Sequence, residues 1–223
     1  MTAAHKRRTR QPGRPPGEAE ANIRDALLEA ASRLFLKHGF DKVTAREIAA
    51  AAGTAPAMIH YYFNNKLGLF RAMLQRAIEP VRQQLLAALA TEGAAPLDFD
   101  AFITTYMRTA SANQWIANLI VNEVLPERGR FRATFIREVA GPMLTMFTQV
   151  LERARSSGVL RADVDVRFAA LTLLSLCIFP FISRSVTGPV LGLQLEGEAL
   201  QQLIDHNVRI CTVGMTRHPE AVK

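Results

Sequence analysis

Residues 45–70 read AREIAAAAGTAPAMIHYYFNNKLGLF, an alanine-rich segment, a glycine, and a second short segment that ends in two tyrosines and a phenylalanine. Thr44 stands three residues before Glu47, the capping-box spacing at which each side chain accepts a hydrogen bond from the other residue's backbone NH. This spacing predicts the start of a helix that ends at Gly53. Pro56 suits the first turn of a following helix, because an NH there has no intrahelical partner. The stretch therefore predicts two short helices joined by a glycine turn.

The flanking residues supply helices on which this pair packs. Upstream, residues 22–38 place apolar side chains at helical spacing as far as Gly39, which predicts one longer helix. The three helices together form a helix-turn-helix, whose last helix has about the width of the DNA major groove. Downstream, residues 67–90 predict a fourth helix, with a kink at Pro80.

The remainder of the chain also has helical periodicity, and no segment alternates with a period of two for long. The predicted fold class is all-α, with an N-terminal three-helix helix-turn-helix domain, a larger helical C-terminal domain, and about nine helices in all. A kink is expected at Gly141–Pro142. The last two helices are expected at about 165–186 and 197–215, joined by a segment with turn signals. The predicted division is a flexible basic arm (1–21), a helix-turn-helix domain (22–68), a second helical domain (69–217) and a tail (218–223).

The positive charge of the chain is concentrated near its N-terminus. The formal net charge is +7, and the residues through Pro80 carry 13 Lys and Arg against 7 Asp and Glu, whereas the remainder carries 14 against 13. This balance favours an anionic partner such as nucleic acid or an acidic membrane surface. Residues 1–17 hold five cationic side chains, three prolines and no acid, which predicts a flexible arm. Gly13-Arg14-Pro15 resembles the core of AT-hook segments, in which the arginine enters a narrow minor groove; the alternative is a solvated tail that adds only nonspecific charge.

Several classes of function find no support in the sequence. Cys177 and Cys211 are expected as buried thiols in a reduced cytosol, and neither lies near a histidine at metal-ligand spacing, so no metal and no cofactor is predicted. The longest apolar run, 168–182, is shorter than the roughly 20 residues of a membrane span and contains a proline, so no membrane partner is expected. No Ser-His-Asp set, paired catalytic carboxylates or phosphate loop indicates an enzyme.

Residues 22–70 resemble the DNA-binding domain of the TetR family of transcriptional repressors. The resemblance rests on features at fixed spacing: Gly39-Phe40, Thr44 before the second helix, Ile48-Ala49, Ala52-Gly53, Phe63 and Lys66. The family often has Gly-Thr-Leu-Tyr where this chain has Ala57-Met58-Ile59-His60, so the set of phosphate contacts is expected to differ. The helical remainder fits the family in length and class but carries no comparable fingerprint.

The predicted DNA contacts follow from the third helix of this domain. Ile59 and Phe63 are four residues apart and share its buried face, so the intervening residues look outward, and Tyr61 is placed on base edges. Side chains at the helix ends fix the protein on the phosphate backbone. If these residues were instead purely structural, the tyrosines would pack on the first helix and Lys66 would be solvated. The predicted DNA-binding residues are Arg14, Thr44, Arg46, Ala55, Pro56, Ala57, His60, Tyr61, Tyr62 and Lys66.

The resemblance also implies that the second domain binds a small molecule and forms a homodimer. The candidate pocket residues are Met107, Arg108, Trp115, Asn118, Met143, Met146 and Phe147, although a methionine or aromatic stripe is often plain core. The candidate dimer residues are Phe168, Leu171, Leu174, Phe179, Leu203, Asn207 and Ile210, because the helix at 165–186 is apolar on nearly every side. If both helices were simply core, this interface would not exist.

The expected function is a cytoplasmic, sequence-specific transcriptional repressor. It is expected to bind double-stranded DNA as a homodimer on an inverted-repeat operator and to be released by a small apolar or amphipathic effector. The alternative is a constitutive or architectural DNA-binding protein without an effector, whose second domain would have a filled core.

Overall fold

The computed structural model describes residues 16–90 and 98–216, and within these ranges the chain is all-α. The N-terminal elements are α1 (Pro16–His38), α2 (Ala45–Ala51), α3 (Ala57–Phe63) and α4 (Lys66–Ala90). The middle elements are α5 (Phe99–Ala112), α6 (Gln114–Leu119), the π-helix η1 (Ile120–Val124), α7 (Arg132–Phe135), the π-helix η2 (Ile136–Ala140) and α8 (Gly141–Ser156). The last are α9 (Val166–Ile182), α10 (Arg184–Leu191) and α11 (Gly197–Met215). These segments join into ten continuous helices over the described ranges, because η1 continues α6, and η2 connects α7 directly to α8.

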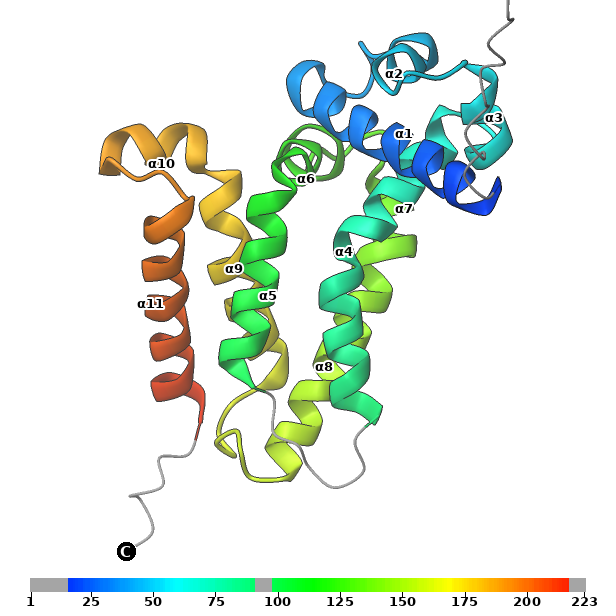
Figure 1. Ribbon diagram of the computed structural model, residues 1–223. Helices are drawn as coiled ribbons and strands as arrows, with labels where there is room; N and C mark the ends of the chain where they lie inside the picture. The colour runs from blue at the N-terminus through cyan, green and yellow to red at the C-terminus, as the bar shows by residue number, and fades with distance from the viewer. Residues whose placement is uncertain (1–15, 91–97, 217–223) are drawn as a thin grey trace, which may run out of the picture.

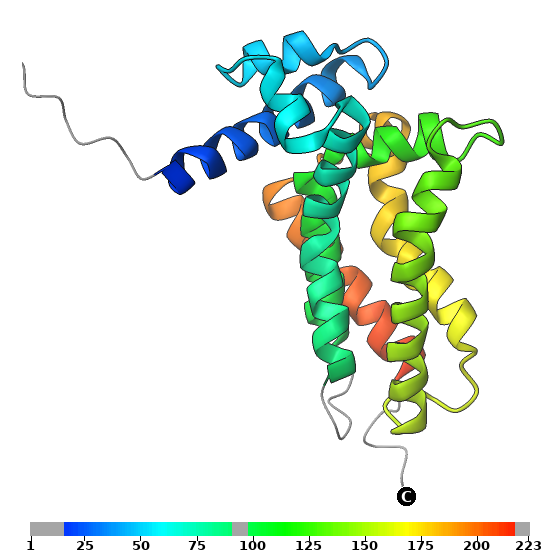
Figure 2. The ribbon, with the colours of Figure 1, turned by 90° about the vertical axis from the view of Figure 1, so that its right-hand side faces the viewer.

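The helices form a small head on a longer bundle. Figure 1 shows α1, α2 and α3 grouped at one end, while α4 runs from this head down the length of the bundle. Turned by 90°, the same arrangement shows α4 and α8 extending side by side below the head (Figure 2). The predicted architecture of a helix-turn-helix domain followed by a helical domain is confirmed.

The buried residues form two clusters, and the boundary between them does not follow the predicted domain division. One cluster fills the bundle and includes Phe102, Leu173 and Ile204. The other contains the core of the head together with Trp115 and Val139, which belong to the C-terminal domain. The head therefore shares its hydrophobic core with the upper part of the bundle, so the two parts are mechanically joined.

The start of the first helix differs from expectation. α1 begins at Pro16, whereas residues 16–21 were assigned to the arm. Proline is well suited to the first position of a helix, and the glutamate and alanine residues that follow it are strong helix formers. The earlier residues, 1–15, lie outside the described residues.

The helix expected at 165–186 is instead two helices. α9 ends at Ile182, and α10 leaves it at a bend of 78°. α10 occupies part of the segment that was expected to hold only turns, which accounts for ten helices rather than nine. The Ser183 hydroxyl donates to the carbonyl of Phe179 at 2.9 Å, a local side-chain bond that competes with helix continuation. No single described helix is long and apolar enough to cross a membrane, and only the bent pair α9 and α10 passes that test together.

The chain passes Gly141–Pro142 without a break in the helix. Proline has no NH to donate and its ring crowds the carbonyl four residues earlier, so an ordinary α-helical turn does not fit here. The π-helical turn η2 immediately precedes these residues and widens the helix. A Cβ on Gly141 would lie 2.9 Å from the carbonyl oxygen of Ile136, so glycine is needed beside the proline.

Both cysteines are buried in the bundle core, as predicted, and both are free thiols. Burial raises the pKa of Cys177 to about 12 and that of Cys211 to about 11. Because the thiolate is the reactive form, we expect neither residue to be labelled by a disulfide-exchange reagent at about pH 8 in the native protein, whereas an ordinary thiol reacts there. Absorbance of the released chromophore should rise only after denaturant is added. Fast labelling of the native protein would contradict this burial.

Candidate nucleic-acid interface and effector cavity

The N-terminus of α2 is held by the capping box that the sequence predicts. The hydroxyl of Thr44 accepts from the NH of Glu47 at 3.2 Å, and the carboxylate of Glu47 accepts from the NH of Thr44 at 2.7 Å. These hydrogen bonds, first of all that from the Thr44 backbone, lower the pKa of Glu47. Thr44 and Arg46 are both exposed at this end of the head.

One face of α3 is buried and the other is open. Ile59 and Phe63 are buried in the head, as predicted, whereas Tyr61 is 68% exposed. Ala55, Pro56, Ala57 and His60 are exposed as well, so the structure brings five of the predicted contacts together on the open side of α3 and the turn that precedes it. His60 shares a 2.5 Å contact between its Nδ1 and the carbonyl of Asn64. Tyr62 is half-buried, and its ring meets that of Tyr61 edge-on at a centroid distance of 4.9 Å.

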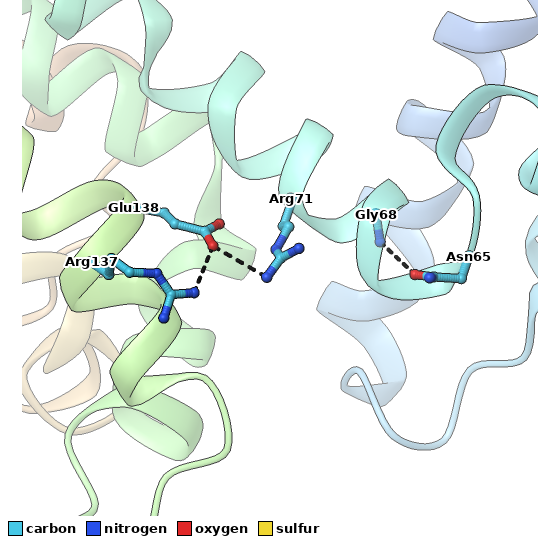
Figure 3. A network of polar contacts seen from close by, with 5 residues as sticks. All are labelled: Asn65, Gly68, Arg71, Arg137 and Glu138. Carbon is cyan, nitrogen blue, oxygen red and sulfur yellow. Dashed lines mark hydrogen bonds and ion pairs between the residues drawn. The ribbon is translucent and has the colours of Figure 1, made fainter.

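A tight turn carries the chain from α3 into α4. Asn64 adopts a left-handed φ of 67°, and the side-chain oxygen of Asn65 accepts from the NH of Gly68 at 2.9 Å (Figure 3). Gly68 packs so closely on the carbonyl of Phe63 that no Cβ fits between them. α3, the predicted recognition helix of the helix-turn-helix, is therefore held at a fixed angle to α4.

Lys66 was predicted to contact a DNA phosphate, but its side chain contacts another part of the chain. Its Nζ donates to the carbonyl of Phe40 at 2.5 Å and lies 4.1 Å from the centre of the Phe40 ring. Burial lowers its pKa. The ammonium is thus engaged within the chain, where it joins the start of α4 to the loop that precedes α2, and a phosphate contact remains a prediction. Arg14 lies outside the described residues.

The bundle contains a cavity of about 360 Å³ below the head. Its walls come from α4, α5, α6, η1, α7, η2, α8 and α9, and they are almost entirely apolar. Of the predicted pocket residues, Met143 and Phe147 line it. Helical periodicity placed these two on the inner side of α8 but could not say which inner side chains face a void.

The other five predicted pocket residues lie elsewhere. Met107 is fully buried in the bundle core, and Arg108 is exposed and donates to Gln201 at 2.8 Å. Trp115 packs against Phe70 of the head, with ring centres 6.0 Å apart. Asn118 and Met146 are half-buried and do not line the cavity. Tyr106, Thr109 and Asn113 line the cavity and were not predicted; their spacing of three and four residues along and just after α5 was the available signal.

The predicted dimer residues divide into three groups. Phe168, Leu171, Phe179 and Ile210 are exposed apolar side chains. Leu203 and Leu174 are half-buried, and Leu174 lines the cavity. Asn207 is only 2% exposed and donates to the carbonyl of Leu176 at 3.0 Å, so it belongs to the core of this chain and its assignment to an interface is wrong.

The cavity walls and the head are connected by specific contacts. Glu138 of η2 pairs with Arg71 of α4 at 3.2 Å and with Arg137 at 2.9 Å (Figure 3). Nearby, the rings of Phe131 and Phe40 meet edge-on at 4.8 Å, and Arg130 forms an ion pair with Asp41 in the loop before α2. η2 and the loop after η1 therefore contact the segments on both sides of the helix-turn-helix, the start of α4 and the loop before α2.

A helix-turn-helix head with one exposed face on α3, joined to a helical bundle that contains an apolar cavity, defines a DNA-binding regulator of transcription. The chain belongs to the TetR family: residues 27–73 match the bacterial regulatory proteins of the tetR family, and residues 98–210 match the tetracyclin repressor-like C-terminal domain. It is a DNA-binding transcriptional repressor of that family, as the resemblance implied.

Individual relatives agree with this assignment. The chain is 26% identical over 195 residues to the HTH-type transcriptional repressor BepR of Brucella suis, covering 85% of this chain and 88% of BepR. The ketosteroid transcriptional regulator KstR2 of Mycobacterium tuberculosis superimposes with a TM-score of 0.63 at 19% identity, over 87% of this chain and 95% of that one. FadR of Bacillus subtilis, solved with stearoyl-CoA, superimposes with a TM-score of 0.64 at 15% identity, over 85% and 98%. At such identities the two solved structures establish the shared fold.

Proposed function

We propose that this repressor binds an inverted-repeat operator in the cytoplasm as a homodimer and leaves it when a small apolar molecule occupies the cavity. The observation that carries the proposal is the position of the cavity, whose upper wall is also the floor of the DNA-binding head. Val124 and Val139 line the cavity and belong to the buried cluster of the head. A ligand that pushes on these residues acts on the head without contacting it.

The open face of α3 supports the DNA half of the proposal. Tyr61 projects from this face, where its ring can meet a thymine methyl and its hydroxyl a base edge. Thr44 and Arg46 stand at the neighbouring end of α2, where a hydroxyl and a guanidinium can hold phosphates and set the register without reading bases. In this proposal α3 contacts the bases and sets sequence preference, whereas α2 contacts the phosphates and positions the protein on the DNA.

The homodimer is supported by the apolar surface of α9 and α11. A two-fold dimer would cover this surface and place two recognition helices in successive major grooves, which requires half-sites about one helical turn or somewhat more apart. Duplexes selected from a random pool by the full-length protein should carry an inverted repeat, and sedimentation at micromolar concentration should show a dimer. A monomer that protects one asymmetric half-site would overturn this part of the proposal.

Tyr61→Ala is expected to weaken binding to the selected operator by about 1–3 kcal/mol, with little effect on random DNA, because the ring is placed on base edges. Titration of both duplexes at one salt concentration measures the two losses. Leu36→Ala, which truncates an exposed apolar side chain of α1, is the matched control and should change neither affinity. Equal losses on both duplexes for Tyr61→Ala would place the ring on the backbone instead.

Release by an effector requires that the ligand favour the DNA-free conformation, since a ligand that binds both states equally shifts nothing. A thermal-stabilisation screen of apolar compounds finds ligands of the native state. Each hit is then added at saturation to the complex with operator DNA. A hit that lowers operator affinity is an inducer. If compounds fill the cavity and none lowers the affinity, the constitutive DNA-binding alternative is favoured.

A further inference from the structure

The cavity wall carries no charge. Among the described residues that line it there is no Asp, Glu, Lys, Arg or His, although it draws on eight helical segments. Glu138 of η2 and Arg71 of α4 pair with each other and do not line the cavity. An ionised group inside this space would have no counter-ion, and burying an unpaired charge is strongly unfavourable.

The few polar groups of the wall lie close together along the chain. Tyr106 and Thr109 lie on α5 and Asn113 caps its C-terminus, so at spacings of three and four residues they form one narrow stripe beside the cavity. Within the described part of the chain, the hydroxyls of Tyr106 and Thr109 donate no hydrogen bond to another residue. The side-chain NH₂ of Asn113 donates to the carbonyl of Thr109 at 2.9 Å, and within the described residues no group donates to its side-chain oxygen.

The rest of the wall consists of apolar side chains. Phe135 of α7, Met143 and Phe147 of α8, and Leu174 and Ile178 of α9 are among them. The stripe itself is neutral, since burial raises the pKa of Tyr106 and keeps its phenol protonated. Hydroxyls and an amide both donate and accept hydrogen bonds, and they suit a ligand hydroxyl, ketone or ester.

We propose that the effector, in the function proposed above, is an uncharged and largely hydrocarbon molecule with a hydroxyl or carbonyl group that is hydrogen-bonded by Tyr106, Thr109 and Asn113. Carboxylates, acyl thioesters with anionic head groups and quaternary ammonium compounds are excluded from a position beside this stripe. The proposal concerns the class of ligand, so it can fail while effector-controlled repression stands.

A matched series of ten-carbon compounds tests the class directly. Pyrene, a hydrocarbon without a hydrogen-bonding group, is first bound to the full-length protein as a fluorescent probe. It is then displaced near neutral pH by 1-decanol, decanoate or decyltrimethylammonium, each kept below its solubility and micelle limits. We expect decanol to displace pyrene at a concentration at least about 10-fold lower than either charged compound. Equal displacement by decanoate or by decyltrimethylammonium would overturn the proposal, because the head group would then lie outside in water.

Two variants locate the polar stripe. Tyr106→Phe removes one hydroxyl, retains the ring, and should weaken decanol binding by about 3- to 10-fold while leaving pyrene affinity unchanged. Thr109→Val should act in the same direction. Thr145→Val, at an exposed position of α8 away from the cavity, is the matched control and should bind both compounds normally. If Tyr106→Phe and Thr109→Val both bind decanol as tightly as the parent protein, the stripe does not hold the ligand.

Discussion

Gly68→Ala is expected to destabilise the protein by roughly 3 kcal/mol or more, a large effect for a single methyl group. A Cβ at this position would collide with the backbone carbonyl of Phe63, and backbone cannot rotate away as a side chain can. The collision forces α3 away from α4, because Gly68 also donates its NH to Asn65 in the turn that joins them. Urea unfolding at one fixed protein concentration measures the loss, and operator binding should fall with it.

Gly214→Ala is the control for this substitution. Gly214 lies in α11 with open space around its Cβ position, and alanine is favoured over glycine in a helix by up to about 1 kcal/mol. This variant should be unchanged or slightly stabilised. If Gly68→Ala unfolds at the same urea concentration as the parent protein, the close packing between α3 and α4 is not as the structure has it.

Leu171→Glu is expected to dissociate the proposed homodimer and lower operator affinity on the order of 100-fold or more. Leu171 is 64% exposed on α9, beside Phe168 and Phe179 on the same face. In the dimer this face would bury two unpaired carboxylates, whereas in the monomer the glutamate reaches water, so the chain should still fold. Two linked recognition helices bind far more tightly than one, which explains the size of the expected loss.

Sedimentation and duplex titration measure the two effects of Leu171→Glu separately. Val121→Glu places the same charge at a 39% exposed apolar position of η1, away from α9, and should remain dimeric. A Leu171→Glu protein that sediments as a dimer with unchanged operator affinity would show that the subunits do not meet on this face.

Local chemistry explains why the DNA-binding head could be read from the sequence. The capping box of Thr44 and Glu47, the glycine turn at Gly53 and the Ile59–Phe63 pair are all interactions within one or two helical turns. Such short-range rules apply before the chain folds, and the structure confirms each of them. The helical class of the C-terminal domain followed from periodicity in the same way.

Other features depended on contacts between residues far apart in the chain. From the sequence alone, Lys66 was predicted to be a cation available to DNA beside α3. In the folded chain its ammonium donates a hydrogen bond to the carbonyl of Phe40, which is 26 residues earlier in the sequence. Asn207 was predicted to lie in the dimer interface, yet it is buried against Leu176 and Met107 of its own chain. The cavity is the space that the side chains of eight segments leave unfilled. The periodicity of a single helix therefore cannot predict it.

The sequence by itself determined the all-α class, the helix-turn-helix and the face of α3 that points outward, because capping, turn formation and amphipathic spacing are local. Only the tertiary structure decided that Met143 and Phe147 border a void while Met107 and Trp115 are solid core, and that Tyr106, Thr109 and Asn113 supply its polar side. The physical reason is that an apolar side chain has the same sequence pattern whether it faces another side chain or an empty space, and its neighbours across the bundle settle which it meets.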